Sequence, residues 1–380
     1  MSAQFPSDNL QLANSEFRNP NSAIRNGPIR VLLVDDSIIT LAILKRILAD
    51  APEIQVVGTA INGREALDMI PSLQPDVICT DLHMPVMDGL EFTRAVMDRF
   101  PRPILVLSIS VQKEQTTNIF QLLEAGAIDV MAKPRGKEVG GYDLDARELI
   151  GKIKVLAGVV AIRRRWKEPP APTVSGKNNL PVIEAAPPGI IGIGASTGGP
   201  QAFLEILSHL PGNLPVPLLC VQHISEGFMQ GLVDWLAQKS PLKIVTAETG
   251  IRPEPGAVYF PREGTHLVLD SQGRLECSNA PPCDGHRPSI SVTFNSLAGI
   301  YGKNAAGVLL TGMGRDGVEG MRAIAQAGGT TIAQDEESST IFGMPKEAIA
   351  ANAARYVLPL PKIAPALLKL LNLDKDAGTP

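Results

Sequence analysis

Apolar runs alternate with helical patterns along the first part of the chain. Each run is rich in Val, Ile and Leu, whereas segments such as IITLAILKRILAD (38–50) and LEFTRAVMDRF (90–100) repeat apolar residues every three or four positions. This alternation predicts a (βα)5 domain over 29–162, with a parallel sheet covered by helices on both faces. The predicted strands are IRVLLVD (29–35), IQVVGTA (54–60), DVICTD (76–81), PILVLS (103–108) and AIDVMA (127–132).

Two segments lack this pattern. Residues 1–28 are polar and rich in Asn and Ser, without the apolar stretch of a signal peptide, and predict a disordered N-terminal arm. Residues 163–188 (RRRWKEPPAPTVSGKNNLPVIEAAPP) combine proline and charge and have no periodic apolar positions. Such a composition is typical of a linker between two domains.

The alternation resumes at residue 189 and predicts a second α/β domain over 189–376. Residues 256–276 break the rhythm with two strand-like runs around a Ser-Gln-Gly turn, which predicts a β-hairpin insertion. We therefore expect the sheet of this domain to have a mixed edge. The predicted strands lie in GIIGIGAS, PVPLLCVQH, PLKIVTAE, AAGVLLTG, TTIAQD and RYVLPL.

Composition and charge exclude several classes of function. The formal net charge is −4 and the isoelectric point about 5.8, which gives no electrostatic case for binding nucleic acid. No apolar run approaches the roughly 20 residues that a membrane helix requires, so we expect no membrane insertion. The four cysteines suit a cytoplasmic protein, and Cys277 and Cys283 lack the neighbours of a zinc site.

Five polar residues fall at the carboxyl ends of the first set of strands, where ligands bind in parallel α/β sheets. Asp35 and Asp36 end the first strand, Asp81 the third, Ser108 the fourth and Lys133 the fifth. Any one of these aspartates could be an ordinary helix N-cap. Together, the carboxylates suit Mg²⁺, and a carboxylate beside a lysine can accept a phosphoryl group.

The motifs VLLVDDS, TDLHMPVMDG, LVLS and AKP resemble those of the receiver domain of response regulators, which is flavodoxin-like. The resemblance implies that Asp81 is phosphorylated and that Mg²⁺, held by Asp35, Asp36 and Asp81, serves this phosphorylation. It further implies a switch role for Ser108 and a phosphate contact for Lys133. Val130 departs from the pattern, because an aromatic switch residue often stands at that position.

A glycine-rich turn, GIIGIGASTGGPQAF (189–203), opens the second domain. It could cradle a nucleotide, but the following strand ends in Gln-His rather than the acidic residue that binds a ribose, and the lysine of a phosphate loop is missing. The alternative is that Ser196, in G-x-S-x-G, is a nucleophile on a tight turn. His223 ends the next strand, and Asp316 lies in a glycine-rich loop after a later strand. We therefore predict a triad of Ser196, His223 and Asp316.

Of the other four histidines, His266 and His286 are competing candidates for the base. His209 is expected to face solvent from a helix, and His83 to lie in a loop. His266 belongs to the predicted hairpin, and His286 lies in the polar segment DGHRPS. His286 is the stronger rival, although the strand-end position favours His223.

The motifs GASTGGP, VQHI, GHRPSISVTF, LTGMGRDG and FGMPKEAI resemble the catalytic domain of the chemotaxis protein-glutamate methylesterases. The resemblance implies a Rossmann-like fold with Ser196 as nucleophile, His223 as base and Asp316 as orienting acid. It implies an oxyanion donor in the backbone around Met313 and places Thr197 in the neighbouring hydrogen-bond network.

This resemblance implies a phosphorylation-controlled serine hydrolase of the cytoplasm. Its reactions would be demethylation of glutamate methyl esters and deamidation of glutamines on the helices of chemoreceptors, without a cofactor for hydrolysis. A chemotaxis histidine kinase would be the phosphoryl donor, and the receiver would cover the catalytic crevice until it is phosphorylated. Two alternatives stay open: an esterase for another ester, and a non-catalytic interaction module.

Overall fold

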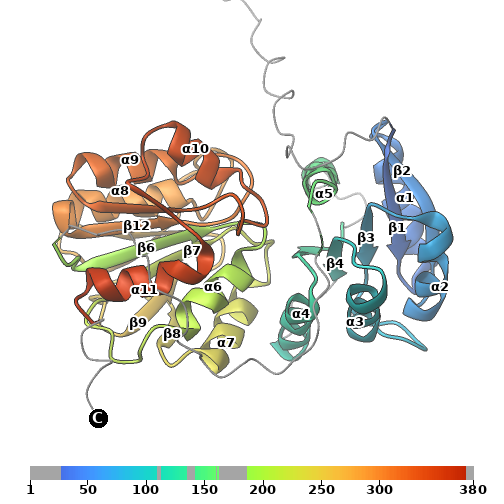
Figure 1. Ribbon diagram of the computed structural model, residues 1–380, viewed down its shortest axis with the longest axis horizontal. Coiled ribbons are helices and arrows are strands. Elements are labelled where there is room, and N and C mark those ends of the chain that lie inside the picture. The colour runs from blue at the N-terminus through green and yellow to red at the C-terminus, as the bar shows by residue number, and fades with distance from the viewer. Residues whose placement is uncertain (1–26, 109–112, 135–141, 160, 162–185, 374–380) are drawn as a thin grey trace, which may run out of the picture.

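Two α/β domains lie side by side (Figure 1). The computed structural model describes residues 27–108, 113–134, 142–159, 161 and 186–373. The predicted arm (1–28) and linker (163–188) lie almost wholly outside these described residues.

The N-terminal domain contains a parallel sheet of five strands in the order β2-β1-β3-β4-β5. This confirms the predicted (βα)5 architecture. Helices α1 and α5 cover one face, and α2, α3 and α4 cover the other. The elements are β1 (Ile29–Val34), α1 (Ile38–Ala49), β2 (Ile54–Ala60), α2 (Gly63–Leu73), β3 (Val77–Thr80), α3 (Gly89–Arg99), β4 (Ile104–Ser108), α4 (Lys113–Ala125), β5 (Asp129–Ala132) and α5 (Tyr142–Leu156).

Capping residues fix where the helices of this domain begin. Ser37, Asn62 and Asp88 each accept a hydrogen bond from a backbone N–H in the first turn of α1, α2 and α3. Such caps satisfy N–H groups that have no partner within the helix. The cap at Ser37 leaves only residues 35–37 between β1 and α1, so Asp35 and Asp36 lie at the edge of the sheet.

The C-terminal domain contains a sheet of seven strands in the order β14-β13-β12-β6-β7-β9-β8. Helices α6, α7 and α11 cover one face, and α8, α9 and α10 the other. The elements are β6 (Ile190–Ala195), α6 (Gly199–Ser208), β7 (Leu218–Gln222), α7 (Met229–Lys239), β8 (Lys243–Thr246), β9 (Ala257–Phe260), β10 (His266–Leu269), β11 (Leu275–Ser278), α8 (Ile290–Tyr301), a 3-10 turn (Gly302–Asn304), β12 (Ala305–Leu309), α9 (Val318–Gln326), β13 (Thr330–Gln334), α10 (Met344–Ala350), β14 (Tyr356–Leu358) and α11 (Leu360–Leu370).

The predicted mixed edge of this sheet is wrong. Every strand pair of the seven-stranded sheet is parallel, including β7 with β9 and β8 with β9. The predicted hairpin does form, between β10 and β11, but it is a separate two-stranded antiparallel sheet. The hairpin packs against α8 instead of extending the main sheet.

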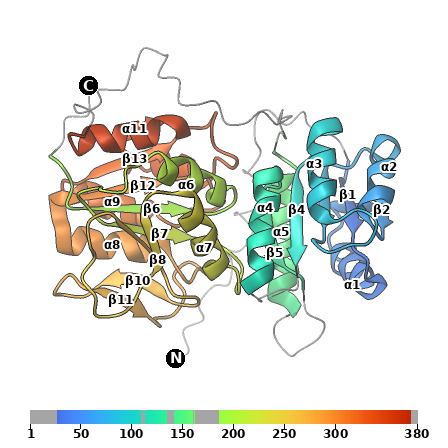
Figure 2. The same ribbon diagram turned by 90° about the horizontal axis from the view of Figure 1, so that it is seen from below.

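The two domains share an apolar contact between α4 and α7, which Figure 2 shows facing each other. The rings of Phe120 and Trp235 stack across the interface with centroids 5.3 Å apart. The Trp235 Nε1–H donates to Glu124 Oε1 at 2.8 Å, and Lys239 pairs with the same carboxylate at 3.0 Å. One continuous cluster of buried apolar residues therefore runs from the first domain into the second.

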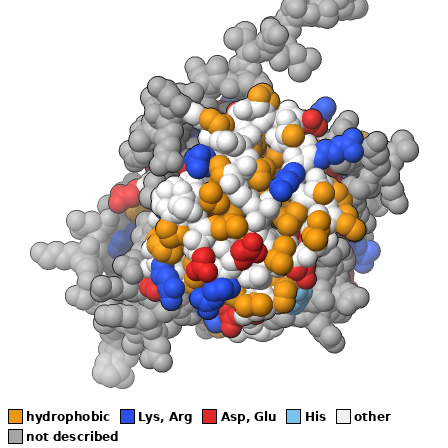
Figure 3. Space-filling view, turned by 90° about the vertical axis from the view of Figure 1, so that its right-hand side faces the viewer, with side chains coloured by type: hydrophobic (Ala, Val, Ile, Leu, Met, Phe, Trp, Pro, Cys, Tyr) orange, Lys and Arg blue, Asp and Glu red, His pale blue; other side chains and the backbone are white. Residues whose placement is uncertain are grey.

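Figure 3 views the opposite side of the N-terminal domain. Apolar, acidic and basic side chains are interspersed on this face, and no single kind dominates it.

Candidate active site

Ser196 follows β6 on a tight turn that leads into α6. Its backbone N–H donates to Thr311 O at 3.0 Å, and its carbonyl oxygen accepts from Gln222 Nε2 at 2.7 Å. Gly198 adopts φ +77°, a left-handed conformation that glycine permits without strain. Ser196 itself is partly exposed, whereas the residues on both sides of it are buried. The turn therefore presents this one side chain at the carboxyl edge of the sheet.

The loop after β12 comes very close to this turn. A Cβ atom on Gly312 would lie 2.6 Å from Ser196 Cβ and 3.1 Å from its backbone nitrogen. Such distances are too short for any side chain at this position, so glycine is required there. The neighbouring Met313 is 44% exposed. The approach brings the backbone around Met313 beside Ser196, where an oxyanion donor was predicted.

His223 and Asp316 form a direct pair. Strand β7 pairs with β6 so that Gln222 lies opposite Ala195, which brings the next residues, His223 and Ser196, to the same edge. His223 Nε2 lies 2.9 Å from Asp316 Oδ2. The structure thus joins two of the three predicted triad residues by a hydrogen bond and places the third on the adjacent strand end.

Asp316 is buried and accepts hydrogen bonds through both oxygens. Oδ1 accepts from Ser289 Oγ at 2.9 Å and from two backbone N–H groups, and Oδ2 accepts from the Ile290 N–H at 2.7 Å. Ser289 caps α8, so the carboxylate lies at the positive end of that helix. Burial raises the pKa of Asp316, but the bonds from His223, Ser291 and Ile290 outweigh it and hold the pKa well below its usual range.

The other ring nitrogen of His223 has no partner. Nδ1 is buried and makes no hydrogen bond in the structure, so the Ser196–His223 hydrogen bond is not formed here. Catalytic hydrogen bonds often close only when substrate binds. Because Nε2 faces a carboxylate, it carries the proton in the neutral ring, and Nδ1 keeps the lone pair that a base requires. The tautomer is thus set by Asp316.

His286 does not replace His223 but lies flat against it. The two ring centroids are 4.1 Å apart and the planes differ by 6°. The pKa of His286 is lowered to about 4, first by burial and then by repulsion from His223. Among the described residues, no hydrogen bond joins His286 to a carboxylate, whereas one joins His223 to Asp316, so the geometry favours His223 as the base.

The remaining histidines lie as expected or serve the fold. His209 is exposed at the end of α6, and His83 is exposed in a loop. His266 is fully buried in β10, and its Nδ1 accepts from the Ser289 N–H at 3.1 Å. His266 therefore supports the residue that caps α8 and holds Asp316. Within the described part of the chain, none of these three forms a hydrogen bond with the His223–Asp316 pair.

Thr197 makes a contact that the sequence did not predict. Its hydroxyl donates to Asp129 Oδ2 at 3.1 Å, so a residue of the N-terminal domain reaches the residue next to Ser196. Lys152 Nζ lies 2.6 Å from the same oxygen. Asp129 lies in an apolar run that predicts only a strand. Its charge, which is unusual within such a run, is the one sequence feature that indicates a further role.

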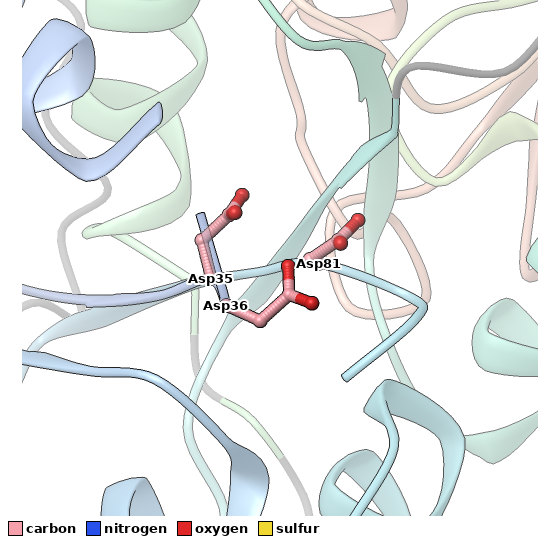
Figure 4. A group of neighbouring side chains, drawn as sticks. All are labelled: Asp35, Asp36 and Asp81. Carbon is pink, nitrogen blue, oxygen red and sulfur yellow. The ribbon is translucent and has the colours of Figure 1, made fainter. Parts of the chain in front are cut away.

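Asp35, Asp36, Asp81 and Lys133 lie together at the carboxyl edge of the N-terminal sheet. Oxygens of Asp35, Asp36 and Asp81 lie within 4.8 Å of one another (Figure 4), and this is the only such acidic, His or Cys group found among the described residues. Lys133 Nζ lies 3.0 Å from Asp81 Oδ2 and 2.6 Å from Asp35 Oδ2. The angles of the contact with Asp35 Oδ2 do not suit a hydrogen bond, so it is an ion pair only. Ser108 is buried at the end of β4, where its carbonyl accepts from the Lys133 N–H.

The acidic group fits a divalent cation. Asp35, Asp36 and Asp81 supply only oxygen ligands, the kind that a hard divalent ion such as Mg²⁺ prefers. Burial raises the pKa of Asp81 more than Lys133 lowers it. Val130 is fully buried in β5, so the position of the usual aromatic switch residue holds a small core side chain.

The cysteines form no metal site in the described part of the chain. All four are free thiols, with Cys79 and Cys220 buried and Cys277 and Cys283 partly buried. Burial raises the pKa of Cys79 to about 12, so this thiol stays protonated at neutral pH.

Two protein-family patterns match the chain. The family described as CheB methylesterase matches residues 191–367, and the response regulator receiver domain matches residues 31–139. The solved CheB methylesterase catalytic domain of Thermotoga maritima is 39% identical, covers 48% of this chain and 98% of its own, and gives a TM-score of 0.47. The response regulator domain of Thermotoga maritima CheB is 34% identical, covers 35% and 98%, and gives 0.32.

Curated relatives match over both domains together. A protein-glutamate methylesterase/protein-glutamine glutaminase of Syntrophus aciditrophicus is 41% identical over 90% of this chain and 98% of its own length. One from Myxococcus xanthus is 42% identical over 90% and 97%. None of the helices in the described residues has the length and apolarity that a bilayer crossing requires. With its receiver and methylesterase patterns in this order, the chain belongs to the family of protein-glutamate methylesterases/protein-glutamine glutaminases.

Proposed function

We propose that this protein removes methyl groups from glutamate γ-methyl esters of chemoreceptors and deamidates receptor glutamines to glutamate. The observation that carries the proposal is the His223–Asp316 hydrogen bond beside the turn that presents Ser196. Such a pair activates a serine hydroxyl for acyl transfer. Relatives matched over nearly their whole length bear the name of this activity.

His223 acts as the general base. Its Nδ1 accepts the Ser196 proton as the serine oxygen attacks the γ-carbonyl carbon, and Asp316 stabilises the resulting imidazolium through Nε2–H. The negative charge on the carbonyl oxygen is stabilised by backbone N–H groups around Met313. Collapse of the intermediate expels methanol, which takes the proton from His223 Nδ1.

The second half-reaction returns the serine. A water molecule gives a proton to His223 Nδ1 and attacks the acyl carbon, and glutamate leaves as Ser196 recovers its proton. A glutamine side chain follows the same route with ammonia as the leaving group. One site therefore serves both reactions, and none of these steps needs a cofactor.

Asp81 is the proposed phosphoryl acceptor, with a chemotaxis histidine kinase as donor. Asp35, Asp36 and Asp81 would hold Mg²⁺, which offsets the charge of the incoming phosphoryl group. Lys133 already contacts Asp81 and would pair with a phosphate oxygen. Ser108 stands on the neighbouring strand end as the switch hydroxyl. These roles rest on the placement of the residues and on the receiver pattern.

Contacts between the domains support control of the esterase by the receiver. Asp129 contacts Thr197, and Gln201 Nε2 donates to Ala127 O at 2.8 Å, so the receiver lies against the residues that follow Ser196. A receptor helix is larger than a side chain and needs this region free. We expect phosphorylation to shift the protein toward an undocked, more active state, because only that state exposes the site.

The test measures methanol release from a methylated cytoplasmic fragment of a chemoreceptor. Wild-type protein should release methanol, and a phosphoryl donor with Mg²⁺ should accelerate the release. Ser196→Ala removes one surface oxygen, so it should abolish the release while stability changes by less than about 1 kcal/mol. Methanol release by Ser196→Ala at the wild-type rate would contradict the assignment of the nucleophile.

A further inference from the structure

Asp129 is a buried carboxylate of the receiver that reaches the catalytic turn. It begins β5, the edge strand that faces the second domain together with α4 and α5 (Figure 2). Its side chain is only 4% exposed. The Oδ2 atom accepts the hydroxyl hydrogen of Thr197 at 3.1 Å and lies 2.6 Å from Lys152 Nζ. The Asp129–Lys152 ion pair of the first domain thus accepts a hydrogen bond from Thr197, the residue beside the proposed nucleophile of the second domain.

The interface between the domains has two chemically different parts. One is the apolar contact of Phe120 with Trp235 between α4 and α7. The other is polar and follows the carboxyl edge of the second sheet, where Ser225 Oγ donates to Glu148 Oε1 at 3.0 Å. The Thr197–Asp129 bond belongs to this second part. Among the described residues, the polar part is the one that contacts the turns carrying the proposed catalytic residues.

The ion pair makes this contact strong. Burial lowers the pKa of Lys152, but the charges of Asp129 and Glu148 outweigh it and raise the pKa, so the ammonium stays charged. A hydroxyl that donates to a carboxylate makes a stronger bond than one between neutral groups. Threonine has a single hydroxyl hydrogen, so while it is given to Asp129 it cannot be given to a substrate oxygen.

We propose that Asp129 is a positioning residue that, through Thr197, slows the chemical step itself while the domains are docked. The contact holds the Thr197 hydroxyl away from the reacting carbonyl, in addition to any blocking of large substrates. This inference rests on the proposed roles of Ser196 and Thr197. It differs from simple covering of the site, because a small ester that can pass the receiver should also react slowly.

The same strand links this contact to the phosphorylation site. Lys133 directly follows β5 and contacts Asp81, whereas Asp129 stands at the other end of the strand. A phosphoryl group on Asp81 gives Lys133 a new partner of higher charge. Because β5 has only four residues, a displacement at Lys133 is transmitted to Asp129.

The experiment uses the full-length, unphosphorylated protein with two substrates. One is methylated receptor and the other is a small soluble glutamate γ-methyl ester. Asp129→Ala should raise kcat for the small ester by about 10- to 100-fold, the range expected for loss of one hydrogen bond to a charged group, and leave KM unchanged. Asp129→Ala should have no such effect in a Thr197→Val background, because the hydroxyl through which it acts is absent.

Glu124→Gln is the matched control. Glu124 is also an interface carboxylate of the receiver, but it contacts Trp235 and Lys239 on α7 and not the turn that carries Thr197. It should change kcat for the small ester by less than about 2-fold, even where turnover of receptor rises. An unpaired, buried Lys152 could impair folding of Asp129→Ala. The paired variant Asp129→Ala/Lys152→Met removes both charges, which avoids this problem, and it should behave as Asp129→Ala does.

Three results would overturn the inference. In the first, the Asp129 variants turn over the small ester no faster than the wild type does. This includes the case in which neither protein turns it over measurably although both still turn over receptor. Glu124→Gln could accelerate the small ester as much as Asp129→Ala does. Asp129→Ala could still accelerate it without the Thr197 hydroxyl. By contrast, a wild-type protein that turns over neither substrate, phosphorylated or not, would contradict the proposed function instead.

Discussion

His286 lies parallel to His223 with ring centroids 4.1 Å apart, and so it covers one face of the proposed base. The ring of His223 is then fixed from two directions, by Asp316 in its plane and by His286 against its face. A tight loop holds His286, since it exchanges backbone hydrogen bonds with Cys283. The stack therefore restricts rotation of the His223 ring about its side-chain bonds.

His286→Phe should keep most of the activity, and His286→Ala should lower kcat by about 2- to 10-fold. Phenylalanine retains a flat ring against His223, and an aromatic pair contributes roughly 0.5–1.5 kcal/mol. Steady-state methanol release at pH 7.5 measures the difference. A larger loss in His286→Phe than in His286→Ala would show that an imidazole nitrogen, and not the stack, is needed.

The titration of His286 should also appear in the stability of the protein. His223, Asp316 and Asp284 surround this ring, and its pKa falls from 6.5 to about 4 on folding. Between these values the unfolded chain binds a proton that the folded chain does not, so stability falls as pH decreases from about 6.5 to 4. Urea unfolding at pH 7 and pH 4.5 should show a smaller difference for His286→Phe than for the wild type. Equal differences would contradict the lowered pKa.

Asp316→Asn should reduce kcat by about 10³- to 10⁴-fold, as expected when the orienting acid of a serine–histidine pair is lost. The asparagine offers one acceptor oxygen, whereas the N–H and O–H groups around Asp316 need both oxygens. One amide N–H would also face a donor, so the midpoint of thermal unfolding should fall. Ser289→Ala is the milder companion, because it removes one of these donors and leaves the carboxylate. A fully active Asp316→Asn would exclude Asp316 from the site.

Gly312→Ala should impair catalysis because the new methyl group would collide with Ser196. Overpacking of this kind costs about 1–3 kcal/mol, either as lost stability or as a displaced catalytic turn. Gly299→Ala in α8 is the control, because no atom lies within 4 Å of its added Cβ. That change should leave kcat unaltered and add about 0.5–1 kcal/mol of stability. Wild-type kcat in Gly312→Ala would mean that the turn tolerates displacement.

Asp81→Asn should abolish activation by a phosphoryl donor and leave unstimulated turnover unchanged. The amide keeps the size of the side chain but is not a nucleophile toward phosphorus. Chelation of Mg²⁺ should have the same effect on the wild type, because the acidic cluster then lacks its cation. The assay compares methanol release with and without a small acyl phosphate. Stimulation of Asp81→Asn by the donor would place the acceptor elsewhere.

The apolar pattern predicted the strands of the first sheet and six of the seven in the second, because buried parallel strands are almost continuously apolar; β9 lies in the segment that was assigned to the hairpin. It did not predict that the C-terminal sheet lacks an antiparallel edge. Strand direction depends on the path of the connections, and the runs at β8 and β9 have the same composition in either direction. The hairpin was found from its turn, but whether a hairpin joins the main sheet depends on tertiary packing against α8.

The candidate sites could be predicted only where residues end strands of one sheet. Asp81 and Lys133, and likewise Ser196 and His223, follow this rule, since the carboxyl ends of parallel strands share an edge. The Thr197–Asp129 bond follows no such rule. It joins residues 68 positions apart in different domains, and only the docking of those domains creates it.

The stacked pair of Phe120 and Trp235 gives the interface an optical reporter. The chain has two tryptophans, and Trp235 is the one within the described residues. Its indole is buried, and its Nε1–H is given to Glu124 of the other domain. Separation of the domains would move this ring into water, so its emission would shift to longer wavelength. Fluorescence of Trp235, with Trp166 replaced by phenylalanine, would therefore follow domain separation in real time without an added label.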